Sequence, residues 1–280
     1  MLKTRIITAV LLLAVLLPVL FSGYLPAVQV VVALFFAAAT WEAFRLFRNR
    51  AALVVAGVWT AVFVYTFYLS DGMSDKLATF WLAIGAAIWL IRFAPSLKFG
   101  LPAAEGMGNS MLSMVYAVTL VSCFVAILLL FGRGPVYLLS VMAIVWAADI
   151  FAYFSGKAFG KHKLAPSISP GKSWEGALGG MLAVLALAAL TVLLAPSVPF
   201  LADTFAVRMA DRLGWGVMLA VLVLIVAASI VGDLFESMLK RRAGMKDSSN
   251  LLPGHGGVLD RIDALVPVLP IAALITPRLF

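Results

Sequence analysis

Charged residues are scarce in this chain. Asp, Glu, Lys and Arg together make up 12% of its 280 residues, whereas an ordinary soluble domain has about 25%. The hydrophobic residues account for 64%, which is more apolar surface than a water-soluble fold can cover. Apolar runs recur along the whole chain, and at roughly 20 residues each is long enough to cross the hydrocarbon core of a bilayer as a helix. The composition therefore excludes a soluble globular domain and predicts a protein that crosses a membrane several times.

Cysteine and acidic residues are also scarce. The single cysteine, Cys123, lies inside an apolar run and cannot form an intrachain disulfide. The 13 acidic residues are outnumbered by 21 basic ones, and the formal net charge is +8. Nucleic-acid binding would explain such an excess, but in a membrane protein it usually reflects topology and contact with anionic lipid headgroups. We therefore expect no nucleic-acid partner.

The apolar runs are continuous and do not alternate with polar residues. This favours helices over a β-barrel, because every backbone polar group in lipid must be satisfied within the protein. We predict an all-α fold, a polytopic transmembrane helical bundle of about nine spans. The spans are placed at residues 6–21, 25–44, 51–70, 77–93, 112–132, 136–154, 175–195, 215–235 and 260–277.

The N-terminus carries Lys3 and Arg5 before the apolar stretch 6–21, a pattern that resembles a secretory signal peptide. Residues 22–26 form a poor cleavage site and another apolar run follows almost at once, so we interpret the stretch as an uncleaved first span. With a cytoplasmic N-terminus, most of the 21 basic residues fall in cytoplasmic segments, as the positive-inside bias requires. The compact chain, without a transit peptide, favours the bacterial inner membrane.

The two halves of the chain differ in character. Residues 1–140 are predicted to be plain transmembrane helices, and residues 141–280 to be helices and cytoplasmic loops that carry the candidate catalytic residues, within one membrane unit. In the first half, Glu42 is the one acid that could lie within the membrane; pairing with Arg45 or Arg48 at the interface explains it as well as a role in a site. Asp149 lies about a turn before the end of its span, and an ionisable residue at that depth is a functional candidate.

Five charged residues near the C-terminus form a regular pattern. Asp233, Glu236 and Lys240 stand at i, i+3 and i+7, so they share one face of a helix. Asp260 and Asp263 repeat the i, i+3 spacing at the start of the last predicted span, where the positive end of the helix favours anions. Carboxylates and an ammonium group are thus predicted to point the same way.

A loop rich in small residues separates these two groups. It contains Pro253, Gly254, Gly256 and Gly257, with His255 among them. Small residues let backbone N–H groups approach a phosphate closely. Asp oxygens are ligands for Mg²⁺, and Lys and Arg bind phosphate oxygens, so the segment holds what a triphosphate and a divalent cation need. Helix capping and turn formation would explain the residues singly, but phosphate chemistry explains the whole string better.

The same string, from Ser237 to Asp263, resembles the signature of the phosphatidate cytidylyltransferase family. It agrees with S-x-φ-K-R-x4-K-D-x-S-x2-L-P-x-H-G-G-φ-x-D-R-φ-D at every fixed position. The resemblance implies that CTP and phosphatidic acid react to give CDP-diacylglycerol and pyrophosphate. It also implies a requirement for Mg²⁺, alone or with a second cation.

A second motif lies at residues 149–176 and includes Ser-Pro-Gly-Lys-Ser-Trp-Glu at 169–175. It is not a Walker A loop, because the G-x4-G-K spacing is absent and no strand is expected before it. It resembles a Ser-Pro-x-Lys-x-Trp-Glu segment of the same family. The resemblance therefore covers about residues 145–270 by strong motifs, and the first half of the chain only by its hydrophobic character.

The roles that we assign are hypotheses. The candidate catalytic residues are Asp260, Lys240, Lys246 and Asp149. The candidate Mg²⁺ ligands are Asp233, Asp260, Asp263 and Glu236. The candidate contacts to nucleotide, phosphate or lipid headgroup are Lys172, Ser173, Arg241, His255, Gly256, Gly257 and Arg261. For His255, donation to pyrophosphate and structuring of the loop stay equally open.

The expected substrates are CTP and phosphatidic acid, bound in a crevice between the sixth, eighth and ninth spans at the cytoplasmic interface; a homodimer is left open. One alternative is a CTP-dependent kinase of a polyprenol or similar alcohol, which needs a general base and leaves the full signature match unexplained. Another is a transporter or flippase that uses Asp149 and Asp233 as an ion relay. The clustering of charge at one predicted interface argues against it.

Overall fold

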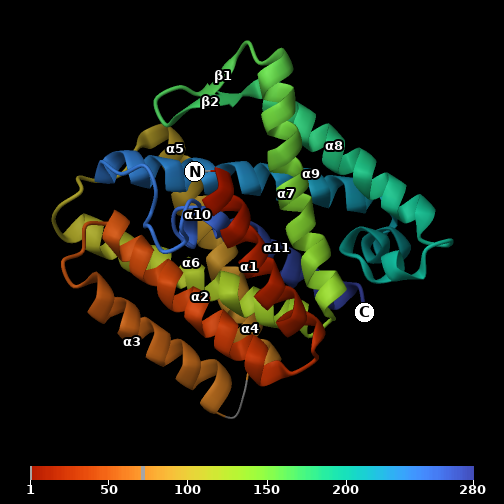
Figure 1. Ribbon diagram of the computed structural model, residues 1–280, viewed down its shortest axis with the longest axis horizontal. Coiled ribbons are helices and arrows are strands. Elements are labelled where there is room, and N and C mark those ends of the chain that lie inside the picture. Colours follow the sequence, from red (N-terminus) through yellow and green to blue (C-terminus); the bar gives the residue numbers. More distant parts are fainter. Residues whose placement is uncertain (1, 71–72) are drawn as a thin grey trace.

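The computed structural model describes residues 2–70 and 73–280, which form a helical bundle (Figure 1). Its long helices are α1 (Leu2–Phe21), α2 (Leu25–Leu46), α3 (Ala52–Val64), α4 (Asp75–Ile88), α6 (Met107–Phe131), α7 (Pro135–Phe159), α8 (Trp174–Leu194), α9 (Phe205–Ala243) and α11 (Leu265–Ile275). The short helices are α5 (Ala94–Phe99) and α10 (Leu259–Ile262), with π-helical turns at Tyr65–Leu69 and Trp89–Phe93 and 3-10 turns at Pro199–Asp203 and Thr276–Arg278.

The apolar runs of the sequence fall on these helices. Within the described residues, seven helices are long and apolar enough to cross a membrane, and two shorter apolar helices cover Ile6–Phe21 and Leu265–Arg278. A polytopic, all-α membrane protein is therefore confirmed, while the count of nine spans stays a prediction. Leu53, Leu90 and Ile91 are each more than 70% exposed, and outward apolar side chains of this kind suit contact with lipid.

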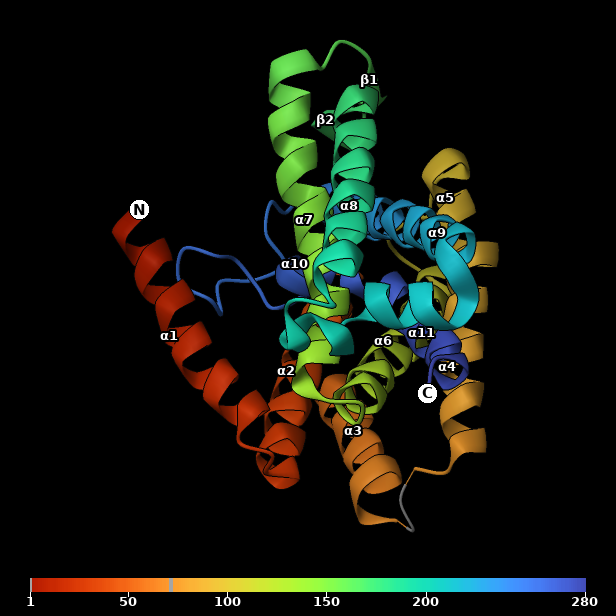
Figure 2. The same ribbon diagram turned by 90° about the vertical axis from the view of Figure 1, so that its right-hand side faces the viewer.

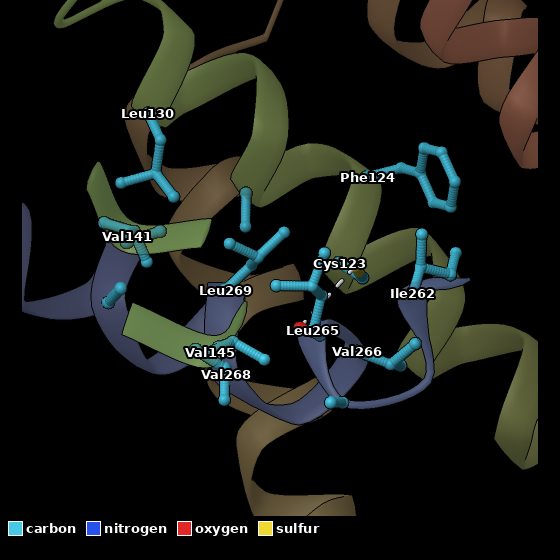
Figure 3. Packing of buried hydrophobic residues seen from close by; sticks show 14 of the residues in the cluster. Cys123, Phe124, Leu130, Val141, Val145, Ile262, Leu265, Val266, Val268 and Leu269 are labelled. Carbon is cyan, nitrogen blue, oxygen red and sulfur yellow. Dashed lines mark hydrogen bonds between the residues drawn. The ribbon is translucent and has the colours of Figure 1, made fainter. Parts of the chain in front are cut away.

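The core lies where α6, α7 and α11 meet, and its side chains interdigitate in Figure 3. Cys123 of α6 is fully buried there, with its thiol 3.9 Å from the carbonyl oxygen of Leu265. A second part of the core is aromatic: Phe235 of α9 packs against Phe93 and Tyr116, with ring centroids 4.5 and 5.5 Å away. These contacts anchor the end of α9 that carries the first group of charged residues.

Helix α1 stands apart from the bundle. Figure 2 shows it diverging from the other helices toward its N-terminus, and its Ile6, Ile7 and Val10 are each more than half exposed. The hydroxyl of Thr8 nevertheless donates to the carbonyl oxygen of Pro253, 2.8 Å away. The start of the chain therefore lies beside the loop between α9 and α10.

Glycines set the close packing of α7 on α8. A Cβ atom on Gly180 would lie 2.5 Å from the carbonyl oxygen of Ala148, and one on Gly176 would lie 2.8 Å from that of Ala152. Small residues at a helix interface let the two backbones approach, which is the usual means of helix association in lipid. The two helices therefore form a tight pair beside α9.

Helix α9 is longer than the predicted span at residues 215–235. It runs for 39 residues and is interrupted at Gly214, whose φ of 81° and ψ of 163° are not helical. Glycine tolerates this positive φ without strain. The helix continues past the predicted end to Ala243, so Glu236 and Lys240 extend the face that begins with Asp233.

A short β-hairpin adds a non-helical element to the all-α bundle. β1 (Lys163–Ala165) pairs antiparallel with β2 (Ser169–Ser173) between α7 and α8, at the top of Figure 1. Pro166, Pro170 and Gly171 disfavour a helix in this segment. At the end of β2, the Ser173 hydroxyl accepts a hydrogen bond from the N–H of Gly176 at 3.2 Å, which caps α8.

Candidate active site

Lys240 lies at the centre of the charged cluster. Its ammonium group donates to Oε2 of Glu236 at 2.5 Å, one turn earlier on α9, and to Oδ1 of Asp260 at 2.7 Å. The side chains of Lys240, Glu236 and Asp260 are 13%, 0% and 5% exposed. The structure therefore brings Glu236 and Lys240, on one face of α9, together with Asp260.

Asp260 is held by several donors besides Lys240. Its Oδ2 accepts hydrogen bonds from the N–H of Ser248 at 2.8 Å, the hydroxyl of Ser248 at 2.9 Å and the N–H of Gly257 at 2.8 Å. Asp260 lies before the last apolar helix. Burial raises its pKa, but the hydrogen bonds from Lys240 and the backbone outweigh burial, and the pKa is lowered. The carboxylate is thus held ionised in one orientation.

The second motif reaches the same cluster through β2. Lys172 forms an ion pair with Oδ2 of Asp233, and the hydroxyl of Ser237 lies 3.3 Å from Oδ1 of Asp233. The two motifs, about 60 residues apart in the chain, are therefore joined in space by one ion pair between the hairpin and α9. At the base of the hairpin, Oε1 of Glu175 lies 2.5 Å from Nδ1 of His162.

A cavity of about 690 Å³ opens beside this ion pair. Asp149, Lys157, Lys172 and Asp233 supply its charged groups. Its apolar lining comes from α7, α8 and α9 and includes Ala148, Ala152, Ala177, Val226 and Ile230. The cavity therefore offers charged groups and an apolar surface together, within a membrane protein.

The predicted crevice between the sixth, eighth and ninth spans needs correction. The walls come from α7, α8 and α9, which correspond to the sixth, seventh and eighth spans, together with β2. Helix α11, the ninth span, does contact α7 and α9, but it packs in the core against α6 and is not among the elements that line the cavity. Close packing at the glycines of α8 brings this helix against α7. Helix α8 therefore occupies the place at the cavity where α11 was expected.

The loop between α9 and α10 is shaped by its glycines and by Arg261. Gly256 has a φ of 84°, and a Cβ atom there would lie 2.7 Å from Oδ2 of Asp260. The guanidinium of Arg261 donates to the carbonyl oxygen of His255, with Nε 3.0 Å away. Arg261 thus stabilises the loop. Nδ1 of His255 is buried and has no hydrogen-bond partner among the described residues.

Two predicted phosphate contacts remain available. Lys246 and Arg241 are exposed, and neither forms an ion pair with another residue in the part of the chain that the structure describes. Lys240 differs from them, because its ammonium group is already held by two carboxylates. Lys246 and Arg241 are therefore available to bind a phosphate that arrives from water. Lys240 instead holds the carboxylates of Glu236 and Asp260 in place.

The acidic residues have the right chemistry for Mg²⁺ but are not gathered into a complete site. Within residues 2–70 and 73–280, no group of three or more His, Cys, Asp or Glu side chains is placed to hold a metal ion. Oε1 of Glu236 is nevertheless buried and has no hydrogen-bond partner in the described part of the chain. Burial and the nearby Asp233 carboxylate raise the pKa of Asp263, which precedes the last apolar helix. The unpaired oxygen of Glu236 and the negative charge gathered around it are features that a hard cation would satisfy.

Sequence reasoning left one buried acid undecided and missed its partners. Glu42 of α2 is fully buried and contacts the loop between α9 and α10 through Ser248 and Ser249. In the described part of the chain it forms no ion pair with Arg45 or Arg48. The one feature of the sequence that pointed to this buried residue was the position of an acid inside an apolar run.

Comparisons with known proteins show the family to which the chain belongs. A family model described as the cytidylyltransferase family matches residues 3–277. The chain is 37% identical to the phosphatidate cytidylyltransferase of Haemophilus influenzae, over 96% of both chains. It is 38% identical to that of Pseudomonas aeruginosa, over 98% of this chain and 96% of the relative. It is 31% identical to that of Bacillus subtilis, over 96% and 95%. The chain belongs to the cytidylyltransferase family, which confirms the resemblance that the motifs indicated.

Proposed function

We propose that this protein transfers the cytidylyl group of CTP to phosphatidic acid, giving CDP-diacylglycerol and pyrophosphate. Relatives that match over nearly the full length carry the name phosphatidate cytidylyltransferase. The structural observation that carries the proposal is the cavity between α7, α8 and α9, which combines the Lys172 and Asp233 pair with an apolar lining. A phospholipid substrate needs both a place for its charged headgroup and an apolar route for its acyl chains.

The reaction needs positioning more than covalent help. A phosphate oxygen of phosphatidic acid attacks the α-phosphorus of CTP, a P–O bond forms, and the bond between the α-phosphorus and the bridging oxygen of pyrophosphate breaks. A phosphomonoester is already anionic near neutral pH, so no strong general base is required. Catalysis then depends on neutralising the charge of the phosphates. Lys172 on the hairpin and the exposed Lys246 and Arg241 are the side chains that we assign to this task.

Mg²⁺ is the proposed cofactor, alone or with a second cation. Asp233 and Glu236 on α9, with Asp263 and Asp260, offer the hard oxygen ligands that this ion prefers. When bound, the ion would neutralise phosphate charge at the reacting centre. Asp260 is already bound by Lys240, Ser248 and Gly257, and Asp233 by Lys172 and Ser237. Among the described residues, Oε1 of Glu236 is a buried carboxylate oxygen without a hydrogen-bond partner, so it is the oxygen best placed to accept the ion first.

The site is proposed to face the cytoplasm from a bacterial inner membrane, where CTP arrives from water and phosphatidic acid from the bilayer. The positive-inside bias supports this orientation, because the hairpin and its flanks carry Lys157, Lys161, Lys163 and Lys172. A homodimer stays open and is tested by the mass of the detergent-solubilised particle.

The test uses purified protein in detergent with phosphatidic acid, Mg²⁺ and CTP labelled in either the α- or the γ-phosphate. We expect label from the α-phosphate in the lipid and label from the γ-phosphate in pyrophosphate, with all turnover lost when EDTA is added. Label from the γ-phosphate in the lipid would instead indicate a kinase. Solute movement without CTP consumption would indicate a transporter.

Two variants accompany the wild type. Asp260→Asn is expected to abolish turnover. The NH₂ group of the amide replaces one of the two carboxylate oxygens that accept hydrogen bonds from Lys240, Ser248 and Gly257. Asp75→Asn serves as the control, because Asp75 is exposed at the start of α4 and belongs to neither motif. Substantial activity of folded Asp260→Asn would refute a role for this carboxylate in the site.

A further inference from the structure

Glu42 lies in α2, in the half of the chain that neither motif reaches, yet four donors from the loop between α9 and α10 converge on its carboxylate. Oε1 accepts hydrogen bonds from the hydroxyl of Ser249 at 2.5 Å and the N–H of Val258 at 3.1 Å. Oε2 accepts a hydrogen bond from the N–H of Leu259 at 2.6 Å, and it lies 3.1 Å from the hydroxyl of Ser248, whose single proton it shares with Asp260. The Glu42 side chain is 0% exposed, and in the described part of the chain all of its hydrogen-bond partners come from residues 248–259.

The same loop holds Asp260. Ser248 joins the two acids directly, because its hydroxyl lies 3.1 Å from Oε2 of Glu42 and 2.9 Å from Oδ2 of Asp260. Gly257 lies between them as well: its N–H donates to Asp260, and a Cβ atom on it would collide with Glu42 and Ser248. The position of Asp260 relative to Lys240 on α9 therefore depends on how Glu42 fixes the loop.

Only a carboxylate satisfies this environment. Each oxygen of Glu42 faces one backbone N–H, that of Val258 or that of Leu259. A glutamine of the same shape would turn its NH₂ group against one of these N–H groups in either orientation, and a backbone N–H cannot become an acceptor. An unpaired buried donor of this kind is costly, so the loop would have to move.

We propose that Glu42 is a positioning residue for the transfer reaction: its carboxylate fixes the loop of residues 248–259 and, through Ser248 and Gly257, the orientation of Asp260. Glu42 touches neither substrate in this arrangement and acts through Asp260. The proposal rests on the proposed function and adds to it a residue of the first half of the chain, which carries none of the family motifs.

The experiment compares wild type, Glu42→Gln and Glu105→Gln. Glu105 is an exposed acid between α5 and α6, outside both motifs, and its variant controls for the loss of one charge. On the monodisperse fraction of each, kcat and KM for CTP are measured, together with hydrogen exchange of the peptide that covers residues 246–262. We expect Glu42→Gln to lower kcat by roughly 100-fold, as a small misplacement of a catalytic group does, and to speed exchange in this peptide alone.

Ser249→Ala is the second variant, because it removes one of the four hydrogen bonds to Glu42 and leaves the N–H groups of Val258 and Leu259 paired. It also removes the acceptor of the Leu251 N–H, but Leu251 is exposed, so water can replace that acceptor. We expect a smaller fall in kcat, and no further fall when it is added to Glu42→Gln, since both act through one loop. Wild-type kcat in Glu42→Gln, or faster exchange spread over the whole protein, would overturn the proposal. If Glu42→Gln does not fold, unchanged kcat in Ser249→Ala overturns it, and a fall confined to kcat supports it. An inactive wild type would count against the proposed function instead.

Discussion

Lys240 is the residue whose removal should cost the most at the candidate site. It is the shared partner of Glu236 and Asp260, and all three side chains are largely buried. Lys240→Met would leave two buried carboxylates without a cation, and breaking a buried ion pair in this way destabilises a protein by about 3–5 kcal/mol. We expect a lower melting temperature in detergent and loss of turnover.

The matched control for this variant is Arg241→Met, because Arg241 is the next residue on α9, is exposed, and has no ion-pair partner among the described residues. Its melting temperature should stay near that of the wild type. Equal melting temperatures for Lys240→Met and the wild type would contradict the central place of Lys240 in the cluster.

Residue spacing predicted part of this site and missed part of it. The i, i+3 and i+7 spacing of Asp233, Glu236 and Lys240 depends only on helix geometry, and the structure keeps all three on α9. The bridge from Lys240 to Asp260 and the contacts of Glu42 join segments about 20 and more than 200 residues apart. Such contacts are set by tertiary packing, which no local spacing encodes.

At the scale of the elements, the pairing of α7 with α8 positions the cavity. We expect Gly180→Ala to destabilise the protein by about 1–3 kcal/mol, the usual range for overpacking. The added Cβ would lie 2.5 Å from the carbonyl oxygen of Ala148, and a backbone atom in a helix cannot give way as a flexible side chain can. The cavity is lined from both helices, so activity should fall as well.

Gly57→Ala on α3 is the control, since a Cβ atom there meets nothing within 4 Å. Alanine is the better helix former by about 1 kcal/mol, so this variant should be neutral or slightly more stable. Thermal unfolding in detergent measures both variants. A Gly180→Ala protein as stable as Gly57→Ala would show that α7 and α8 are not in close contact.

The elements were predictable to different degrees. Long apolar runs predict helices reliably, because a chain in lipid has few other ways to satisfy its backbone. The hairpin between α7 and α8 was not predicted, because its strands have only three and five residues and are held by tertiary contacts of Glu175 and Lys172. The extension of α9 beyond residue 235 was also missed, because the predicted span was bounded by hydrophobicity and the helix continues through charged residues.

At the scale of the whole molecule, the predicted orientation in the membrane can be tested on the two ends of α8. Ser167 lies in the hairpin turn before this helix and Ser197 lies in the turn after it, and both are exposed. The helix has 21 residues, and at about 1.5 Å per residue it is long enough to separate the two turns by a bilayer. The only cysteine of the chain, Cys123, is fully buried, so it should react little with a polar reagent.

We expect a membrane-impermeant maleimide to label Ser197→Cys in intact spheroplasts and Ser167→Cys only after lysis, because the lysine-rich hairpin belongs on the cytoplasmic side. Wild-type protein, treated in parallel, measures the background from Cys123. The opposite pattern would place the hairpin and the candidate site outside the cytoplasm, where CTP is not supplied. Labelling of both variants in intact spheroplasts would mean that α8 does not cross the membrane, and the cavity between α7, α8 and α9 would then need another explanation.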